Sequence, residues 1–534
     1  MLTRRRFLAG NAFAAAGALS TQPMDFLLRE SSAAQAADSN WDSGLVFHIL
    51  PTVNHDRILF KCSFREPLGQ TPEIHIDGRR IAGAQTDSRG SFWQFDIADL
   101  RPATEYQVEL GSGSGRALAE PWSISTFPDP MSDVAHVRLA FFACPGGHDV
   151  MASINDKQTL AIRRALLEKA VSLSPHAIIG NGDHVYWDLW SPRLSPRYGA
   201  NETAIAYTGR FDRTKPIFGT ENEGFLLKAG VEQIAPLYRT SCKSIPVFLL
   251  QDDHDYFDND DATDEIITFP PNDVMLRLAR ATQKLAYPEF LPDLNRPRGL
   301  AGTREDEGRP EISSNFGTLR YGKLLEVLLH DDRRSGTMHG PSAVFVEPEA
   351  EAWLKARMQD PTVTHVVNAP SLPPGWTKGN WYDYYPDLTD DGPASVATPK
   401  PYWQQGWLSQ HDRLIEAMHA MRGRIPLIIS GDIHACAHGS ILRSGDLDLS
   451  DNPIATMLPG TLGTAVSFHT DAQHPNHLDA TNEWGLVGEN GFLIADFYGD
   501  RVDCSFFTWN GATQSVASIP GLDASYRTTL QPVG

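Results

Sequence analysis

Five short segments of the chain concentrate the residue types that bind metal ions and move protons. The segments are Ala143-Cys144, Gly180-Asn181-Gly182-Asp183-His184-Val185-Tyr186, Gln251-Asp252-Asp253-His254-Asp255, His330-Asp331-Asp332-Arg333 and Ser430-Gly431-Asp432-Ile433-His434. Carboxylate oxygens suit hard cations, while imidazole and thiolate groups add ligands for transition metals. So many carboxylates in one crevice would repel one another, and many would take up protons, unless cations neutralised them. If the segments meet in space, they predict a centre with more than one metal ion.

An apolar run of the kind that forms a buried strand comes directly before each of these segments. The runs are 137–142, 176–179, 246–250, 324–329 and 426–429, with a further one at 365–367. Residues 157–173, between the first two runs, have the periodicity of a helix. Alternating strands and helices predict a sheet with helices outside it, and such sheets bind ligands at the carboxyl ends of their strands. We therefore expect the five segments to converge on one site.

A centre of this kind is suited to one reaction in particular. Two metal ions about 3.5–4 Å apart can hold the attacking and the leaving oxygen of an in-line displacement at phosphorus. Water bound to the metals loses a proton near neutral pH and becomes the nucleophile, so the site needs no Ser or Cys nucleophile. The segments therefore predict hydrolysis of phosphate esters.

Three motifs in this set resemble those of the metallophosphoesterase superfamily. They are Gly182-Asp183-x-x-Tyr186, Asp252-Asp253-His254-Asp255 and Ser430-Gly431-Asp432-x-His434. In this order, and with Cys144 ahead of them, they resemble in particular the PhoD-like alkaline phosphatase family. The resemblance covers nearly the whole chain after residue 36. It implies an α/β fold, the four-layer αββα sandwich of metallophosphoesterases, preceded by an N-terminal all-β sandwich domain.

The resemblance also implies a set of metal ligands. They are Cys144, Asp183, Tyr186, Asp252, Asp253, Asn259, Asp432 and His434. Asp183 would bridge two metals, while Tyr186 as a tyrosinate and Cys144 as a thiolate would bind Fe(3+). Ca(2+) ions would complete the cluster, because carboxylate oxygens suit them, and Zn(2+), Mn(2+) and Mg(2+) are the alternatives. The sequence leaves open which of Asp252 and Asp253 binds a metal.

Three catalytic residues follow from the same resemblance: His254, Arg333 and Asp183. His254 would steady the phosphoryl group in the transition state. Arg333 lies in a segment that resembles the family's Asp-Thr-Arg, and it would contact phosphate oxygens as a planar fork. The family usually has Trp and Glu where this chain has Gln251 and Asp255. These differences concern the contacts around the metals rather than the reaction.

Residues 1–36 have the three parts of a twin-arginine export signal. Arginines at 4–6 precede apolar residues, a weakly hydrophobic segment covers 9–19, and the small residues Ala34 and Ala36 have the spacing that a signal peptidase needs. The signal predicts one partner, the twin-arginine export machinery, and a mature chain that begins near Ala37. We expect this mature chain to be periplasmic or secreted and to have no transmembrane anchor.

Residues 37–129 differ in character from the rest, with short β-branched and aromatic runs separated by turn residues. This spacing predicts a small antiparallel sandwich, which we interpret as non-catalytic. The segment 100–108 resembles the tyrosine corner of fibronectin type III domains, in which a Tyr hydroxyl bonds to the backbone at the end of a strand. After a Pro-rich hinge, we expect the catalytic domain at 130–525 and a C-terminal tail at 526–534.

Charge and cysteine content restrict the classes of partner. The 534 residues include 46 Lys and Arg and 66 Asp and Glu, a net charge of −20, so a nucleic acid would meet repulsion over most of the surface. We therefore expect no role as a nucleic-acid scaffold. The 5 cysteines are too few and too scattered for a disulfide framework.

Together these features predict an exported, metal-dependent phosphoesterase of the alkaline phosphatase type. It would hydrolyse phosphate monoesters, with diesters as a second class, by attack of metal-bound hydroxide on a small phosphoester or a phospholipid. A phospholipase D-like phosphodiesterase is one alternative, since the same metals serve either ester. A non-catalytic cell-surface binding protein is the other, and the intact Asp183, His254 and His434 weigh against it.

Overall fold

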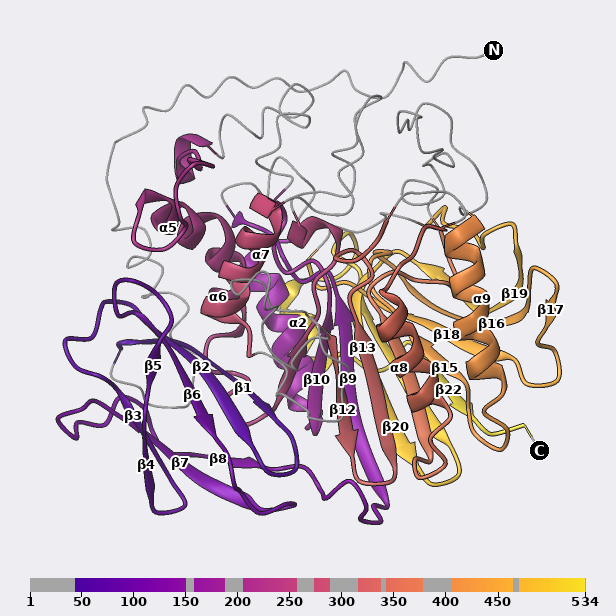
Figure 1. Cartoon of the computed structure of the whole chain (residues 1–534), viewed down its shortest axis with the longest axis horizontal. Coiled ribbons are helices and arrows are strands. Elements are labelled where there is room, and N and C mark those ends of the chain that lie inside the picture. The colour runs from indigo at the N-terminus through magenta and orange to yellow at the C-terminus, as the bar shows by residue number, and fades with distance from the viewer. Residues whose placement is uncertain are drawn as a thin grey trace. The chain divides into compact units, whose positions relative to one another are not determined.

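The structure is a computed structural model that describes residues 44–149, 158–187, 205–256, 273–288, 316–337, 342–377, 405–463 and 470–533. These described residues belong to one compact unit and are drawn as a ribbon in Figure 1. The predicted export signal at 1–36 and the candidate ligand Asn259 lie outside the described residues. Within the described ranges, no helix combines the length and the apolar character that a membrane crossing requires.

The N-terminal strands form two antiparallel sheets of four strands each. The first has the order β1-β2-β6-β5 and the second the order β4-β3-β7-β8. The strands are β1 (Val46–Val53), β2 (Ile58–Phe64), β3 (Glu73–Ile76), β4 (Arg79–Ala82), β5 (Ala84–Gln85), β6 (Phe92–Ile97), β7 (Glu105–Gly111) and β8 (Trp122–Ser125). In β7, buried Tyr106, Val108 and Leu110 alternate with more exposed residues, which is the period of a half-buried strand. The predicted β sandwich is confirmed.

The sandwich contains the tyrosine corner that its sequence predicts. Tyr106 is buried, and its hydroxyl accepts a 2.7 Å hydrogen bond from the backbone N–H of Arg101. Because Arg101 precedes the turn that leads into β7, this bond ties the turn to the strand that follows it. The corner therefore holds one end of the second sheet in place.

The rest of the chain builds two larger sheets, of which the first has six strands in the order β11-β10-β9-β20-β21-β22. They are β9 (His136–Ala143), β10 (Ala177–Asn181), β11 (Val247–Leu249), β20 (Asn490–Tyr498), β21 (Val502–Trp509) and β22 (Tyr526–Leu530). β9, β10 and β11 run parallel, whereas β20, β21 and β22 pair antiparallel. The predicted strands at 137–142, 176–179 and 246–250 are confirmed. Residues 526–530, expected as part of a tail, form β22, because the chain returns to pair with β21.

The second large sheet has eight strands, with the order β12-β13-β14-β15-β18-β16-β17 and with β19 paired to β16. They are β12 (Phe316–Tyr321), β13 (Leu325–His330), β14 (His365–Pro370), β15 (Leu427–Ile429), β16 (Cys436–Ser444), β17 (Leu447–Asp448), β18 (Ile454–Pro459) and β19 (Leu478–Val487). β13, β14, β15 and β18 are parallel neighbours. The predicted strands at 324–329, 365–367 and 426–429 correspond to β13, β14 and β15. Both large sheets therefore carry candidate site segments at the carboxyl ends of parallel strands.

Helices pack on both large sheets. The described ones are α2 (Leu160–Ser172), α5 (Glu221–Leu226), α6 (Glu232–Tyr238), α7 (Asp273–Ala286), α8 (Pro348–Met358) and α9 (Gln405–His419), with a π-helix η3 (Leu227–Val231) and 3-10 helices η4 (Asp253–Tyr256) and η6 (Val516–Gly521). Successive residues of β9 enter different cores: Phe141 packs in the core shared with the second sheet, and Ala140 packs in the core that contains Leu166 of α2. Leu354 of α8 and Met418 of α9 pack with the second sheet. The layers run helix, sheet, sheet, helix, which confirms the predicted fold class.

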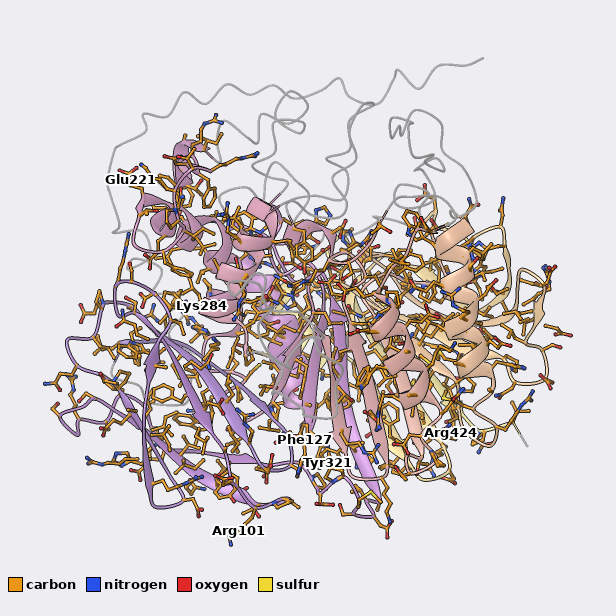
Figure 2. All side chains as sticks on the ribbon, viewed as in Figure 1. Arg101, Phe127, Glu221, Lys284, Tyr321 and Arg424 are labelled. Carbon is orange, nitrogen blue, oxygen red and sulfur yellow. The ribbon has the colours of Figure 1, made fainter. Side chains whose placement is uncertain are left out.

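The sandwich packs directly against the larger sheets. Phe127, after β8, stacks on Phe248 of β11 with 6.1 Å between ring centroids, and it meets Tyr321 of β12 edge-on at 5.1 Å (Figure 2). Lys61 of β2 is buried, and its Nζ donates a 2.8 Å hydrogen bond to the backbone carbonyl of Lys284 in α7. These contacts join the sandwich to strands and helices of the α/β part.

The cysteines are all buried free thiols: Cys62, Cys144, Cys242, Cys436 and Cys504. Burial raises the pKa of the Cys62, Cys436 and Cys504 thiols, and it raises the pKa of Cys242 to about 12. These thiols therefore stay protonated at neutral pH and act as core residues. Cys144 differs from them because it lies beside candidate metal ligands.

The tyrosine corner can be tested by replacing Tyr106 with Phe, which removes the hydroxyl and keeps the ring. We expect the free energy of unfolding to fall by about 1 kcal/mol, because the backbone N–H of Arg101 loses its acceptor. Thermal unfolding of the full-length variant measures the change. A variant as stable as the wild type would contradict the structural role assigned to this hydroxyl.

Candidate metal centre

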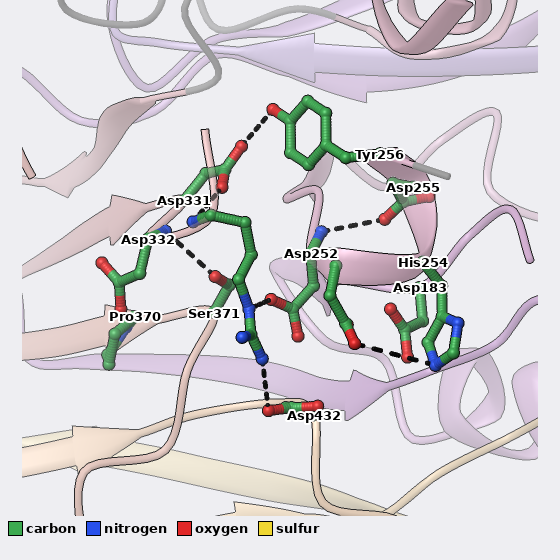
Figure 3. Close-up of polar contacts among 12 residues, drawn as sticks. Asp183, Asp252, His254, Asp255, Tyr256, Asp331, Asp332, Pro370, Ser371 and Asp432 are labelled. Carbon is green, nitrogen blue, oxygen red and sulfur yellow. Dashed lines mark hydrogen bonds and ion pairs between the residues drawn. The ribbon is translucent and has the colours of Figure 1, made fainter. Parts of the chain in front are cut away.

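Three candidate ligands sit in tight turns just after parallel strands. Cys144 follows β9, Asp183 follows β10 and Asp432 follows β15, and their φ angles are 48°, 54° and 68°. A positive φ is unfavourable for residues with a side chain, and such conformations persist mainly where function needs them. The turns bring the side chains to the carboxyl ends of both sheets, where Asp183 and Asp432 lie near Asp252 (Figure 3).

The turns also contact one another through the backbone. The N–H of Cys144 donates to the carbonyl of Gly182 at 3.2 Å, and the N–H of Gly146 donates to the carbonyl of Asp183 at 2.9 Å. Gly182 has a φ of 75°, and a Cβ at this position would lie 2.5 Å from the Cβ of Asp252. Only glycine meets both conditions, the positive φ and the close approach of the segment after β11. This explains the glycine before Asp183 in the motif.

Among the described residues, three groups of side chains have the geometry to hold a metal ion. They are Cys144, Asp183 and His434; Asp183, Asp253 and His254; and Asp252, Asp253 and Asp432. Within each group the ligand atoms lie within 4.8 Å of one another. Asp183 and Asp253 each belong to two groups, which is the arrangement that a carboxylate bridging two metals requires. The structure thus joins candidate ligands from strand ends of both large sheets.

Tyr186 lies beside the first of these groups. Its hydroxyl donates a 3.1 Å hydrogen bond to Oδ2 of Asp183 and lies 3.3 Å from Nε2 of His434. The same imidazole nitrogen is 3.8 Å from Oδ2 of Asp183. The Tyr186 ring also lies against the ring of His254, with centroids 4.5 Å apart. Thiol, phenol, imidazole and carboxylate therefore meet in one place, and this donor set suits a transition metal.

Arg333 is a fixed cation of the site, and it lies between carboxylates in the interior. It is completely buried, and its Nε donates to Oδ1 of Asp252 while its Nη2 donates to Oδ2 of Asp432, each at 2.7 Å. Asp252 follows β11 and Asp432 follows β15, so the guanidinium joins the ends of the two large sheets. The contact of Arg333 with a phosphate group stays a prediction.

Burial makes negative charge costly in this site. Asp183, Asp252, Asp253 and Asp432 are at most 2% exposed. Burial raises the pKa of Asp252 and of Asp432 well above the usual range, although Arg333 acts in the opposite direction on both, and burial also raises the pKa of Asp253. Arg333 alone does not offset the effect of burial on the pKa of Asp252 and of Asp432. Further cations would keep them ionised.

Several buried carboxylate oxygens are available to bind a metal ion instead of accepting a hydrogen bond. Oδ1 of Asp183, Oδ2 of Asp252 and both oxygens of Asp253 accept no hydrogen bond from the part of the chain that the structure describes. Buried carboxylates normally accept hydrogen bonds or coordinate metals. The oxygen-rich third group suits a hard cation such as Ca(2+), and the first group, with its thiol and the neighbouring phenol, suits iron. The residues present therefore fit the metals expected from the sequence.

Nine of the ten predicted site residues are brought together. They are Cys144, Asp183, Tyr186, Asp252, Asp253, His254, Arg333, Asp432 and His434. The tenth, Asn259, is not among the described residues. Both Asp252 and Asp253 face the shared space, so the structure leaves each of them available to a metal.

Two supporting residues are clear only from the structure. Asp255 accepts hydrogen bonds from the N–H of Val185 at 2.8 Å and from the N–H of Asp252 at 3.0 Å, so its carboxylate ties two motifs together. Tyr256 donates its hydroxyl to the carboxylate of Asp331. The acidic motifs drew attention to Asp255 and Asp331, but no pattern marks Tyr256. Its role depends on a residue 75 positions away in the chain.

Comparison with known proteins supports the fold. No family model matches the chain, and no curated protein matches it in sequence. Solved structures do match: that of PhoD has a TM-score of 0.58 at 12% identity and covers 92% of this chain and 92% of its own. The purple acid phosphatase PPD1 from yellow lupin (Lupinus luteus) seeds has a TM-score of 0.52 at 11% identity, over 92% of this chain and 75% of its own. At such identities the likeness establishes the fold, which this chain shares with both structures.

The close approach at Gly182 gives a direct test of the site geometry. Replacing Gly182 with Ala places a Cβ 2.5 Å from that of Asp252 and displaces the candidate ligand. A misplacement of about 1 Å lowers turnover by roughly 10²-fold, and we expect loss of bound metal as well. Elemental analysis and phosphoester hydrolysis measure the two effects.

Gly219 provides the matched control. Its φ of 74° equals that of Gly182 within a degree, but a Cβ there has no described atom within 4 Å. Replacing Gly219 with Ala costs the same backbone strain, about 1 kcal/mol, without a clash. We expect this variant to keep its metal and its turnover. Equal effects at the two positions would show that strain alone, not the approach of Asp252, accounts for the loss.

Proposed function

We propose that this chain is an exported, metal-dependent phosphoesterase of the PhoD-like alkaline phosphatase type. One observation carries the proposal: residues predicted from separate motifs converge on a single buried, carboxylate-rich centre. The fold shared with PhoD and with a purple acid phosphatase supports it. The arginine cluster at 4–6 supports export through the twin-arginine machinery to the periplasm or the medium.

The metal-binding residues would divide between two kinds of ion. Cys144, Asp183, Tyr186 and His434 would hold iron, and Asp252, Asp253 and Asp432 would hold calcium. When bound, the cations supply an acidified water as the nucleophile and neutralise charge on the phosphoryl oxygens. Asp183 also belongs to the group with Asp253 and His254, and Asp253 in turn belongs to the proposed calcium group, so these two carboxylates link all three groups.

His254 is the site residue best placed to touch a substrate. Its side chain is 18% exposed, whereas Asp253 beside it is fully buried, and its Nε2 lies 3.8 Å from Oδ2 of Asp253. An imidazole held at this position can donate a hydrogen bond to a phosphoryl oxygen while charge develops on it. Arg333 adds a fixed positive charge. Because the interior excludes bulk water, both interactions are stronger than they would be at a surface.

The proposal also specifies which class of phosphate ester is hydrolysed. We propose phosphate monoesters as the main substrates and diesters as a second class. Turnover of p-nitrophenyl phosphate, of its bis ester and of phosphatidylcholine by the full-length protein separates a phosphatase from a phospholipase D-like phosphodiesterase. A purified protein that is stable without metal and hydrolyses no phosphoester would favour the other alternative, a non-catalytic cell-surface binding protein.

Asp183 is the residue whose loss should matter most. Changing Asp183 to Asn keeps the size of the side chain and removes the charge that would hold two ions, so we expect turnover to fall by about 10³-fold. Asp496→Asn is the control, because this buried carboxylate pairs with Arg138 at the opposite end of β9 from Cys144. The control should keep wild-type turnover. Near wild-type turnover in Asp183→Asn would refute the bridging role.

Metal removal and spectroscopy test the proposed ligands directly. Exhaustive chelation of the full-length protein should abolish hydrolysis, and reloading should restore it. A tyrosinate or thiolate on Fe(3+) gives a visible charge-transfer band, which Tyr186→Phe should shift or abolish while Tyr106→Phe in the sandwich leaves it unchanged. If hydrolysis persists after the metals are gone, the metal-dependent mechanism is wrong.

A further inference from the structure

Tyr256 connects two segments that carry site residues. It is the last residue of the 3-10 helix η4, which also contains Asp253 and His254. Its ring is 2% exposed, and its hydroxyl donates a hydrogen bond to Oδ2 of Asp331 (Figure 3). η4 follows β11 of the six-stranded sheet, and Asp331 follows β13 of the eight-stranded sheet. The hydroxyl therefore bridges the ends of the two sheets.

The second oxygen of the Asp331 carboxylate organises the turn that presents Arg333. Oδ1 of Asp331 accepts the backbone N–H of Arg333 at 2.8 Å and that of Arg334 at 3.1 Å. A carboxylate that accepts two successive N–H groups fixes the local backbone. With Oδ2 held by Tyr256, the orientation of this carboxylate, and hence of the turn, is set from the opposite sheet.

The turn in question determines where the buried guanidinium lies. The Nε of Arg333 donates to Asp252 and its Nη2 donates to Asp432, each at 2.7 Å. Two charge-assisted hydrogen bonds of this length leave little tolerance for displacement of the side chain. A shift of the Asp331 turn would therefore move the guanidinium and alter the orientation of both candidate metal ligands.

We propose that Tyr256 is a positioning residue, which holds the Arg333 guanidinium between two candidate metal ligands by fixing the Asp331 turn. The inference rests on the proposed function. Tyr256 itself belongs to none of the three groups with metal-binding geometry, and it acts through its hydrogen bond. Outer residues that orient ligands in this way commonly change metal affinity or activity by about 10-fold or more.

The pKa of Asp331 provides a second measurement, the pH dependence of turnover, which a purely structural contact would not change. Burial raises the pKa of the Asp331 carboxyl to about 7, and the hydrogen bonds from Tyr256 and from the two backbone N–H groups act in the opposite direction. Among the described residues, the titratable and charged groups that act on it are Tyr256 of η4, His330 of β13 and Arg334 of the turn, while Arg333 contributes its backbone N–H. Losing the tyrosine hydroxyl raises this pKa further, so more of the carboxyl is protonated at neutral pH.

Tyr256→Phe in the full-length, metal-loaded protein is the test. We expect kcat for p-nitrophenyl phosphate to fall about 10-fold with little change in KM, since the ring is kept and the guanidinium is misplaced. The acid limb of the pH profile should move to higher pH. Metal release into EDTA, followed by elemental analysis, should be faster than in the wild type. Tyr106→Phe, a buried tyrosine with a hydrogen-bonded hydroxyl in the sandwich, should change none of the three.

Asp331→Asn, alone and combined with Tyr256→Phe, completes a double-mutant cycle. The amide keeps an oxygen acceptor for the backbone N–H groups but does not titrate, so the limb that depends on Asp331 should disappear. Adding Tyr256→Phe to this variant should then have little further effect, because the hydroxyl acts through the carboxylate. Additive losses in the double variant, or an unmoved acid limb in Tyr256→Phe, would overturn the inference.

The outcome for the wild type separates this inference from the proposed function. If the wild type holds metal and hydrolyses esters but the two substitutions act independently, only the role of Tyr256 is wrong. If the wild type holds no metal and hydrolyses no ester, the proposed function fails, and the inference fails with it. If Tyr256→Phe, Asp331→Asn and the double variant change the rate of metal release into EDTA but no ester is hydrolysed, Tyr256 positions metal ligands in a site with another activity.

Discussion

The structure depends on an electrostatic constraint: several carboxylates share a water-poor space between the ends of two sheets. Asp183, Asp252, Asp253 and Asp432 are buried there, and burial raises the pKa of the Asp252, Asp253 and Asp432 carboxyls. The chain provides Arg333 as one counter-charge, and several carboxylate oxygens accept no hydrogen bond from the described residues. Burying several carboxylates close together is unfavourable in free energy unless cations bind, so we interpret the site as a candidate metal-binding site.

Backbone geometry makes this crowding achievable. Parallel strands from both sheets end at the site, and the turns after β9, β10 and β15 adopt positive φ values at Cys144, Asp183 and Asp432. Gly182 lets the second turn approach the segment after β11 within van der Waals limits. Backbone hydrogen bonds join the turns after β9 and β10. These bonds and the strands on either side stabilise the turns against the conformational strain of the positive φ angles.

Contacts across the two sheets add a second level of organisation. Arg333 joins the segment after β11 to the segment after β15, and Tyr256 joins η4 to the turn after β13. Asp255 ties the η4 segment to the turn that carries Asp183 and Tyr186. Because the Arg333 and Tyr256 bonds run between the two sheets, the relative placement of the sheets and the geometry of the site are coupled.

The sequence alone determined the features that depend on neighbouring residues in the chain. Apolar runs identified the strands, the residues after them identified nine members of the site, and the segment around Tyr106 identified the corner of the sandwich. Only the tertiary structure decided that both Asp252 and Asp253 face the shared space, that Asp255 braces the backbone, that Tyr256 reaches Asp331, and that residues 526–530 form β22. The physical reason is that side-chain periodicity is local, whereas partners far apart in the chain are chosen by the register and packing of whole sheets.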